Sequence, residues 1–262
     1  MLHLLPFSFQ ELEPLPQQYE RMIFKGQYPR IYDRNIAPTD FYPSYIQTHV
    51  ERDVRMMKNI GNINTFILFI QLCAGRIGQL LNYAGLASDA GISPNTAKSW
   101  LSILESSYIL YRLQPYHRNY NKRLVKSPKL YFYDTCLACS LLGITMADQV
   151  GMHFMKGSLF ENLILNEFIK RNYHRGENRQ PYFWRDNHGK EIDCLVVNGE
   201  DVVPVEIKAG KTYSASYFDN LKFWRSLTNS PKNQGYVVYG GDQTLKTSAG
   251  ELISWRNLER IE

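Results

Sequence analysis

Two apolar runs separated by a turn form the clearest pattern of hydrophobic and polar positions in the chain. Residues 191–197 and 202–208 are rich in Val and Ile, and Asn-Gly lies between them. Such runs around Asn-Gly predict two strands joined by a turn. Because strand side chains alternate between faces, we expect Glu206 and Lys208 to point the same way, and Asp193 on the neighbouring strand can join them. The pattern therefore predicts two carboxylates and an ammonium at one spot, with apolar side chains on the other face.

A helical pattern precedes these strands. Phe160, Ile164 and Phe168 recur at the spacing of helical turns, which predicts a helix. Glu161 lies on this helix and is a third candidate carboxylate. The same residue has a second interpretation, because Ser158 stands three positions earlier, and a Ser-x-x-Glu pair can form a capping box that only satisfies the start of a helix.

The predicted cluster suits magnesium-dependent cleavage of a phosphodiester. Mg²⁺ keeps several waters, so one or two carboxylates with a substrate phosphate suffice as ligands, and Asp193 and Glu206 would supply them, with Glu161 as a third. The metal lowers the pKa of a bound water. Lys208 would orient that water or offset charge on the phosphate. The alternative is structural: Glu206 and Lys208 as an exposed ion pair of little energetic value, and Asp193 as a residue before a turn.

Upstream, the pattern predicts two short helices and a hairpin. Residues 81–90 form the first helix, and the second begins with Ser93 as N-cap and Pro94 at its first position. An apolar stripe follows at Ala97, Trp100, Leu101 and Leu104. Residues 108–113 and 130–133 are then apolar strands, and the loop between them carries Lys and Arg but no acid. Two helices followed by a basic hairpin predict a winged helix.

A winged helix places its second helix in the DNA major groove and holds phosphate with its wing. The candidate DNA-binding residues are Asn95, Lys98 and Ser99 on the helix and Arg118, Lys122, Arg123 and Lys126 on the wing. The alternative is a winged helix used for protein contact or as a rigid lid, because a fold does not fix a function.

The charge of the chain is unevenly distributed. The net charge is +5, yet residues 55–130 contain ten Lys and Arg against two acids, a local charge of +8. A basic block on an otherwise mildly acidic chain indicates a polyanionic partner. The simpler interpretation is a solvated surface face.

The composition, with 44% apolar and 21% charged residues, is typical of a soluble globular protein. No stretch approaches the length of a membrane span, and the start lacks the basic region and cleavage site of a signal peptide. Four cysteines do not indicate a disulfide framework, and Cys136-x-x-Cys139 has no second ligand pair nearby, so zinc or redox chemistry is not expected there. We expect a cytoplasmic protein without a membrane partner.

The order of four residues resembles the PD-(D/E)XK, or restriction-endonuclease-like, superfamily: Glu161, Asp193, Glu206 and Lys208. The core of that superfamily is a helix carrying Glu, strands carrying Asp and Glu-x-Lys, and then a helix and a further strand. Residues 214–227 and 236–239 match the last two elements, and the resemblance covers residues 150–262. It implies a catalytic metal site at the four residues, although some members have lost cleavage and only bind nucleic acid.

The whole chain resembles the C-terminal portion of prokaryotic AAA+-like ATPases that carry a C-terminal domain of unknown function. The matching stretches are residues 4–9, 26–29, 45–55, 133–135 and the Glu-x-Lys region. The chain departs from that family because it has no Gly-x-x-x-x-Gly-Lys-Ser/Thr loop, so its backbone cannot cradle nucleotide phosphates there. We expect no ATP site and no ATP hydrolysis by this chain alone, and a chain that begins where the ATPase core ends, as a truncated product or fragment.

Together these patterns predict an α+β chain with a helical, winged-helix half followed by an α/β restriction-endonuclease-like domain. The expected parts are a remnant of the ATPase core edge and helical lid at 1–60, the winged helix-turn-helix at 61–145, and the nuclease-like domain at 150–262.

Three functions are open at this point. The first is DNA binding with Mg²⁺-dependent phosphodiester cleavage. The second is a non-catalytic module that binds nucleic acid or docks to an ATPase partner. The third is a decayed remnant, which would expose the apolar residues Leu4, Leu5, Phe7 and Phe9 that once joined a missing sheet.

Overall fold

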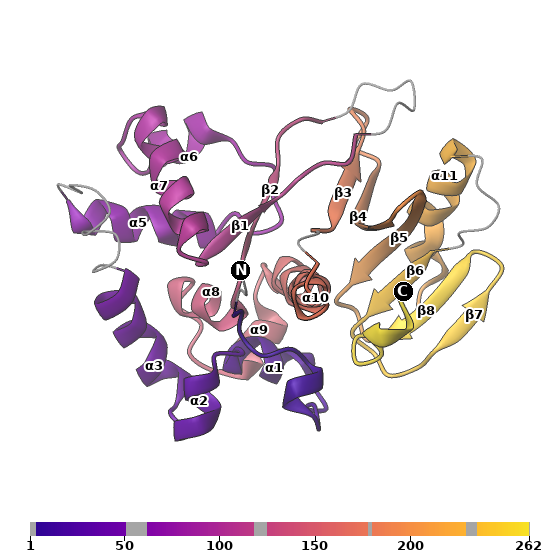
Figure 1. Cartoon of the computed structure of the whole chain (residues 1–262), viewed down its shortest axis with the longest axis horizontal. Helices are drawn as coiled ribbons and strands as arrows, with labels where there is room; N and C mark the ends of the chain where they lie inside the picture. The colour runs from indigo at the N-terminus through magenta and orange to yellow at the C-terminus, as the bar shows by residue number, and fades with distance from the viewer. Residues whose placement is uncertain (1–3, 51–61, 118–124, 178–179, 229–234, 262) are drawn as a thin grey trace. The chain divides into compact units, whose positions relative to one another are not determined.

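The computed structural model describes residues 4–50, 62–117, 125–177, 180–228 and 235–261. The chain divides into two compact units (Figure 1). The helical unit comprises His3–Arg112 and Lys129–Leu163. The sheet unit comprises Met1–Leu2, Leu113–Pro128 and Ile164–Glu262. The expectation of an α+β chain, with a helical N-terminal half and a sheet-containing C-terminal half, is confirmed.

The helical unit begins with short helices around a buried aromatic and aliphatic core. These are η1 (Gln10–Leu12), α1 (Tyr19–Lys25), α2 (Pro29–Arg34), α3 (Pro38–Tyr45) and the π-helical η2 (Ile46–Val50). Proline at the first position of α2 and α3 suits a helix start, where no N–H partner is needed. The expected exposure of the N-terminal apolar residues holds for Leu4, which is 98% exposed, but Phe9 is buried at 7% because it packs into the unit.

Three helices and a two-stranded sheet follow. They are α5 (Ile63–Ala74), α6 (Tyr83–Asp89), α7 (Pro94–Ser106), β1 (Leu110–Leu113) and β2 (Lys129–Phe132). The predicted N-cap is confirmed, since the Ser93 hydroxyl accepts the Thr96 N–H at 3.0 Å and Pro94 opens α7. The apolar stripe of α7 is buried, and the Trp100 ring packs edge-on against Phe66 and Phe69 of α5.

The helical unit ends with α8 (Thr135–Leu141), α9 (Ala147–Met152) and the first part of the long α10 (Lys156–His174), whose residues from Ile164 on belong to the sheet unit. The side chain of Asn162 on α10 binds both backbone groups of Phe132, accepting its N–H at 2.9 Å and donating to its carbonyl at 2.7 Å. The Asn162 side chain thus satisfies the backbone groups of Phe132 as a further strand would. The capping-box interpretation of Ser158 and Glu161 is wrong, because α10 already begins at Lys156.

The sheet unit contains six strands in the order β3-β4-β5-β6-β8-β7. They are β3 (Tyr182–Arg185), β4 (Glu191–Asn198), β5 (Asp201–Lys208), β6 (Tyr236–Tyr239), β7 (Leu245–Thr247) and β8 (Gly250–Ser254). The predicted β4–β5 hairpin is antiparallel, with Cys194 opposite Val205, and Gly199 in the turn takes a φ of +64°, as glycine does readily. Strands β5, β6 and β8 run parallel.

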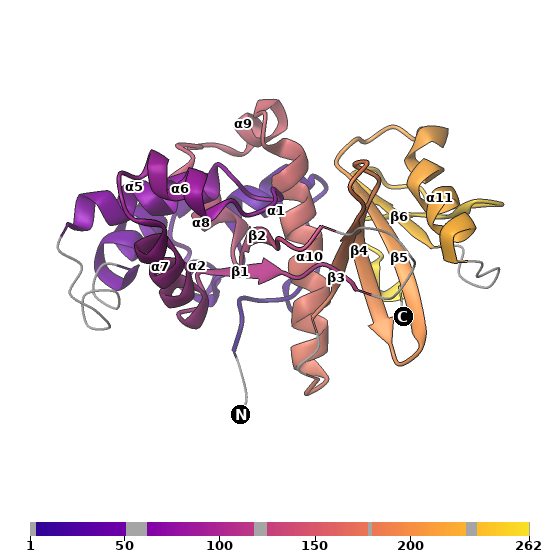
Figure 2. The same cartoon turned by 90° about the horizontal axis from the view of Figure 1, so that it is seen from above.

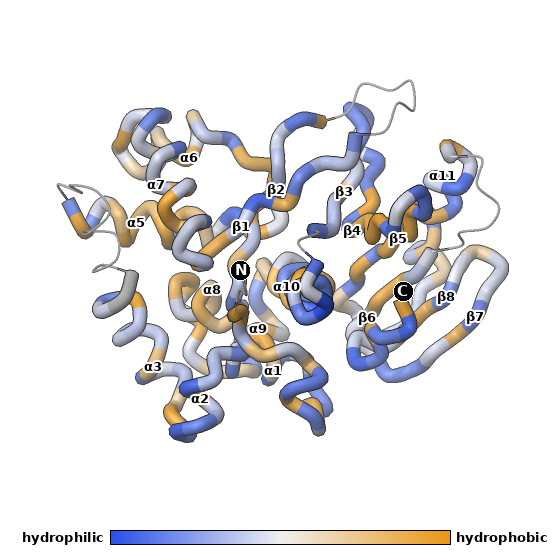
Figure 3. Tube along the Cα trace, viewed as in Figure 1, coloured by the Kyte–Doolittle hydropathy of each residue, from blue (hydrophilic) through white to orange (hydrophobic). Residues whose placement is uncertain are grey.

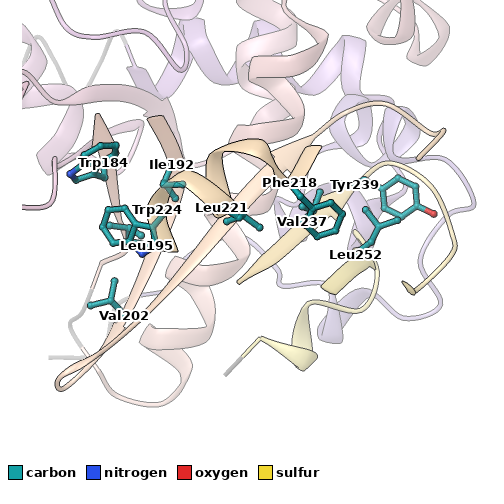
Figure 4. Packing of buried hydrophobic residues seen from close by; sticks show 10 residues of the cluster. All are labelled: Trp184, Ile192, Leu195, Val202, Phe218, Leu221, Trp224, Val237, Tyr239 and Leu252. Carbon is teal, nitrogen blue, oxygen red and sulfur yellow. The ribbon is translucent and has the colours of Figure 1, made fainter. Parts of the chain in front are cut away.

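The connection from β5 to β6 passes through η3 (Ala215–Phe218) and α11 (Asp219–Thr228). Figure 2 shows α11 lying along one face of the sheet, and a cluster of buried residues fills the space beneath it (Figure 4). This cluster includes Trp184, Phe218, Leu221, Trp224 and Val237. Figure 3 shows apolar stretches along β4, and Ile192, Cys194 and Leu195 of this strand are fully buried.

Candidate functional site

The hairpin brings three of the predicted site residues together. The Lys208 ammonium donates to Asp193 Oδ2 at 3.0 Å and to Glu206 Oε2 at 2.6 Å. Asp193 Oδ2 also accepts the backbone N–H of Ile207 at 2.8 Å. Because Glu206 and Lys208 are two positions apart on β5, their side chains share a face, as the alternation predicts.

The apolar residues are not confined to the opposite face, contrary to the expectation from the pattern. Val202 lies on the same face of β5 as Glu206 and belongs to the buried cluster under α11, and Val205 and Ile207 on the other face are buried as well. Both faces of this strand are covered. The cluster of Asp193, Glu206 and Lys208 is therefore set into an apolar surrounding rather than on an open polar face.

Burial distinguishes the three side chains. The Glu206 side chain is 0% exposed, whereas those of Asp193 and Lys208 are 13% and 30% exposed. Asn220, in the first turn of α11, donates to Glu206 Oε2 at 3.4 Å. Within the described part of the chain, the other oxygen, Glu206 Oε1, is buried without a hydrogen-bond partner. Such a group costs free energy unless something binds it.

The surrounding groups shift the acidity of the cluster. Burial, followed by the charge of Asp193, raises the pKa of Glu206 to about 8, even though Lys208 acts in the opposite direction. Burial alone would lower the pKa of Lys208, but Asp193 and Glu206 outweigh it and raise that pKa above its ordinary value. Lys208 thus stays cationic, and Glu206 holds its proton near neutral pH unless further positive charge is present.

The residues fit a hard divalent cation. Oxygen ligands from one or two carboxylates are what Mg²⁺ takes from a protein when waters and substrate supply the rest. Asp193 and Glu206 provide two carboxylates, and the orphaned Glu206 Oε1 is a donor atom without another role. Among the residues that the structure describes, no group of three or more His, Cys, Asp or Glu forms a complete cage.

The cluster lies where parallel strands end. Lys208 is the last residue of β5 and stands in register with Tyr239 at the end of β6, which pairs with Ser254 at the end of β8. Asp193 is near the start of the antiparallel β4, so it lies beside the carboxyl end of β5. Ligands of open α/β sheets bind at the carboxyl ends of their strands.

Glu161, the fourth predicted site residue, has other partners. It accepts from the Tyr131 hydroxyl and from Lys129 Nζ, the latter at 3.3 Å, all within the helical unit. The Lys129 side chain is only 3% exposed, so this ion pair fixes α10 against β2. The structure therefore joins three of the four residues in one cluster, and the assignment of Glu161, which lies in the other unit, to the metal site stays a prediction.

Among the predicted DNA-binding residues, Asn95 and Lys98 are exposed on α7, and Ser99 is half-buried. The Lys98 ammonium lies 5.6 Å from the centre of the Tyr83 ring. Lys126 is exposed. Arg118, Lys122 and Arg123 lie outside the described residues.

Three cations of the basic block are paired with acids. Arg76 pairs with Asp89, Arg112 pairs with Glu105, and the buried Lys129 pairs with Glu161. Because Asp89 and Glu105 are already subtracted in the local charge of +8, only the pairing with Glu161, which lies outside residues 55–130, lowers that charge further. Lys98 and Lys126 are exposed at the surface.

The sequence did not predict one contact of the helical unit, the junction between residues 26–27 and Asp134. Asp134 is fully buried, accepts the Gln27 N–H at 2.8 Å, and caps α8 by accepting the Cys136 and Leu137 N–H groups at 2.9 Å. Gly26 has a φ of +69°, and a Cβ there would stand 2.1 Å from the Tyr42 hydroxyl. Residues 26–29 and 133–135, two separate stretches of the resemblance to ATPase-associated proteins, are in contact in the structure.

The two cysteines of the lone Cys-x-x-Cys pair belong to the same junction. Both are buried on α8, and burial raises the pKa of each thiol above its ordinary value. Buried thiols of this kind are structural and unreactive.

Comparison with known families covers both halves of the chain. Residues 16–148 match the family described as Domain of unknown function (DUF8612), and the chain belongs to that family. Residues 156–258 match Domain of unknown function (DUF4143), a domain that is commonly associated with AAA ATPases. This agrees with the coarse part of the resemblance to ATPase-associated proteins.

Two curated relatives are similar over part of their length. Uncharacterized protein Rv2008c of Mycobacterium tuberculosis and uncharacterized protein Mb2031c of Mycobacterium bovis are each 28% identical to the chain over 172 residues. The match covers 66% of this chain but only 38% of each relative. No solved structure matches the chain significantly. Within the described residues, every helix is too short or too polar to cross a membrane.

Proposed function

We propose that Asp193, Glu206 and Lys208 form a divalent-metal-dependent site that cleaves phosphodiesters, of the restriction-endonuclease-like type. One observation carries the proposal: a fully buried carboxylate oxygen, Glu206 Oε1, has no hydrogen-bond partner in the described residues and lies in a cluster with a second carboxylate and a lysine. In a purely structural ion pair, a hydrogen-bond donor to Glu206 Oε1 would stabilise the fold. In a cation site, the same oxygen must be available to bind the metal.

Each side chain has a separate task in this proposal. Asp193 and Glu206 would hold the cation, with Asp193 oriented by the Ile207 N–H and Glu206 by Asn220. A bound Mg²⁺ would supply Lewis-acid activation of the phosphate and of a water. Lys208 is the most exposed of the three and remains protonated, so it can donate hydrogen bonds to a phosphate oxygen or to the attacking water.

The topology supports the assignment. A hairpin that carries Asp and Glu-x-Lys is followed by a helix and a parallel strand, in the order β4, β5, α11, β6. The cluster also lies at the carboxyl end of β5, and ligands of open α/β sheets bind at the carboxyl ends of the strands.

The helical unit supports a nucleic-acid partner. We propose that α6, α7, β1 and β2 form a winged helix, because the order of elements is that of the motif and α7 presents Asn95 and Lys98 to solvent. Lys126, exposed in the segment between β1 and β2, is a further candidate for phosphate contact. The predicted partner is DNA, held through phosphate contacts and therefore sensitive to salt.

An ATPase is the second proposed partner. The DUF4143 match indicates this association, and the curated relatives are longer than the matched region. In this proposal the chain processes or holds nucleic acid together with an ATPase domain that acts on the same substrate.

The test is cleavage of plasmid and single-stranded DNA with Mg²⁺ or Mn²⁺. We expect metal-dependent cutting that Lys208→Ala reduces by about 10²–10³-fold, the effect of removing one donor to a transition-state charge. Lys222→Ala is the matched control, because Lys222 is an exposed lysine of α11 that pairs with Asp219. Equal cutting by wild type and Lys208→Ala would contradict the proposal.

A non-catalytic module gives a different result in the same experiment. If neither protein cuts, but DNA is bound without metal and released by salt, the alternative of a nucleic-acid-binding module is favoured. Charge reversal at Lys98 and Lys126 should then lower the affinity for duplex DNA.

A further inference from the structure

The loop that follows Lys208 is fixed by the neighbouring strand ends. Gly240, directly after β6, donates its N–H to the Lys208 carbonyl at 3.0 Å and to the Gly210 carbonyl at 3.1 Å. One backbone amide thus holds both the end of β5 and the start of the loop. The start of the loop, through Gly210, is therefore tied to the end of β6.

Close contacts restrict this loop further. A Cβ on Gly210 would lie 2.2 Å from the Tyr217 hydroxyl, and one on Gly241 would lie 2.5 Å from the Lys211 carbonyl oxygen. The Gly241 contact is with backbone, so a side chain at Gly241 would force the backbone to shift, whereas the Gly210 contact is with the end of the Tyr217 side chain. The loop backbone at Lys211 therefore packs closely against the residues that follow β6.

The side chains that the loop presents are a cation and an aromatic ring. Lys211, Thr212 and Tyr213 are exposed, and Tyr213 is 40% exposed. Behind the Tyr213 ring, the buried Phe218 packs edge-on with the ring centres 6.4 Å apart. Phe218 stands two residues before Asn220, which contacts Glu206. The ring is therefore supported by the same short segment that orients the buried carboxylate.

We propose that this loop is a subsite for a nucleic-acid strand with an unpaired base, in which Tyr213 stacks on the base and Lys211 holds an adjacent phosphate. The inference rests on the proposed function, and it specifies the substrate class of that site as single-stranded or locally opened nucleic acid. An aromatic ring can stack only on a base face that is not already covered by its duplex neighbours. Proteins that bind single strands combine aromatic side chains that stack on bases with basic side chains that contact the phosphate backbone.

The test measures binding separately from cleavage. Fluorescence anisotropy would follow a labelled 12-nucleotide single strand and the matching 12-base-pair duplex in EDTA, where the metal-dependent reaction cannot occur. We expect Tyr213→Ala to weaken single-strand binding about ten-fold, because one base stacked on an aromatic side chain contributes about 1–3 kcal/mol. Tyr213→Phe should bind as wild type does, and the affinity for duplex should change less than about two-fold.

Phe154→Ala is the matched control, since Phe154 is an 84% exposed aromatic residue of the helical unit. Wild-type single-strand affinity of Tyr213→Ala, or equal losses for single strand and duplex, would overturn the subsite. Cleavage assays of the same proteins distinguish the two proposals. A loss of single-strand binding in Tyr213→Ala, with no metal-dependent cutting by any protein, supports the subsite and contradicts the catalytic site.

Discussion

Two buried carboxylates, one in each unit, are held in opposite ways. Asp134 in the helical unit accepts three backbone N–H groups, from Gln27, Cys136 and Leu137. Glu206 in the sheet unit is buried as deeply, yet one of its oxygens has no partner in the described residues. Equal burial therefore accompanies two different hydrogen-bonding states, one carboxylate with backbone donors at both oxygens and one with an open acceptor.

The energetic meaning of the two groups differs accordingly. A carboxylate saturated by backbone donors stabilises the charged form and the fold around it. A carboxylate with an open acceptor, a raised pKa and a neighbouring lysine is a cost to the fold that a ligand can offset. The comparison predicts that substitutions near Asp134 damage stability and that substitutions near Glu206 alter ligand binding and pH dependence.

The largest effect is expected at Asp134. Asp134→Ala leaves three buried N–H donors without an acceptor, and because each costs about 1–3 kcal/mol, the free energy of unfolding should fall by at least about 3 kcal/mol. Urea denaturation followed by circular dichroism measures it. Asp148→Ala, at an exposed acid of α9, should change stability by less than about 0.5 kcal/mol. Similar stability of both variants would break the comparison.

The second effect is expected at Gly26. An alanine there would be strained at a φ of +69° and would overlap the Tyr42 hydroxyl, for a combined loss of about 2–5 kcal/mol. Gly143 has a φ of +74° with open space around it, so Gly143→Ala isolates the backbone strain alone, about 1–2 kcal/mol. Thermal unfolding of the two variants gives the difference. A difference near zero would mean that the close approach at the junction has no energetic consequence.

The third prediction concerns pH and Glu206. The folded chain keeps the Glu206 proton up to about pH 8, whereas an ordinary carboxyl, like that of the unfolded chain, loses it near 4.5. The stabilisation from this proton is therefore complete below about pH 4.5 and is lost as the pH rises through about 8. Glu206→Gln should remove this loss, so its free energy of unfolding should exceed that of wild type above pH 8.

Denaturant titrations from pH 5 to about pH 9 test this difference, with Glu200→Gln in the exposed β4–β5 turn as the control. If the free energy of unfolding of Glu206→Gln depended on pH as that of wild type does, the Glu206 carboxyl would not have the raised pKa, and the difference from Asp134 would not hold.

The smallest effect is expected at Asn220. Removal of its 3.4 Å contact to Glu206 in Asn220→Ala should lower the affinity for Mn²⁺ by about two- to ten-fold, which corresponds to the 0.5–1.5 kcal/mol of a typical hydrogen bond. Isothermal titration calorimetry measures it, and Ser216→Ala in the preceding η3 is the control. Unchanged affinity would mean that Asn220 does not orient the carboxylate.

Local patterns allowed much of the fold to be predicted. The strands β4 and β5, the Asn-Gly turn between them, and the capped start of α7 follow from neighbouring residues, because each depends on interactions over a few positions. The junction of Gly26 and Asp134 could not be predicted in this way. Its hydrogen bond from Gln27 to Asp134 joins residues 107 positions apart, and no periodicity reports such a contact.

The charged residues of the basic block also show which features local sequence predicts and which depend on the fold. The count of Lys and Arg in residues 55–130 is a property of the sequence, but the pairing of Arg112 with Glu105 and of Lys129 with Glu161 depends on helices folding against strands. The partners of Glu161, Lys129 and Tyr131, could not be predicted from local patterns for the same reason. The signal that could have indicated them was the position of Lys129 and Tyr131 on one face of a short strand.

The sequence by itself determined that Glu206 and Lys208 share a strand face, because the two-residue repeat of a strand is a local property. Only the tertiary structure decided that Glu206 is closed off from water, with Asn220 of α11 at one oxygen and no described partner at the other. That outcome depends on a helix packed over the sheet and on a neighbouring strand that supplies Asp193. Burial is a collective property of packed elements, and it turns an ordinary carboxyl into one with a pKa of about 8.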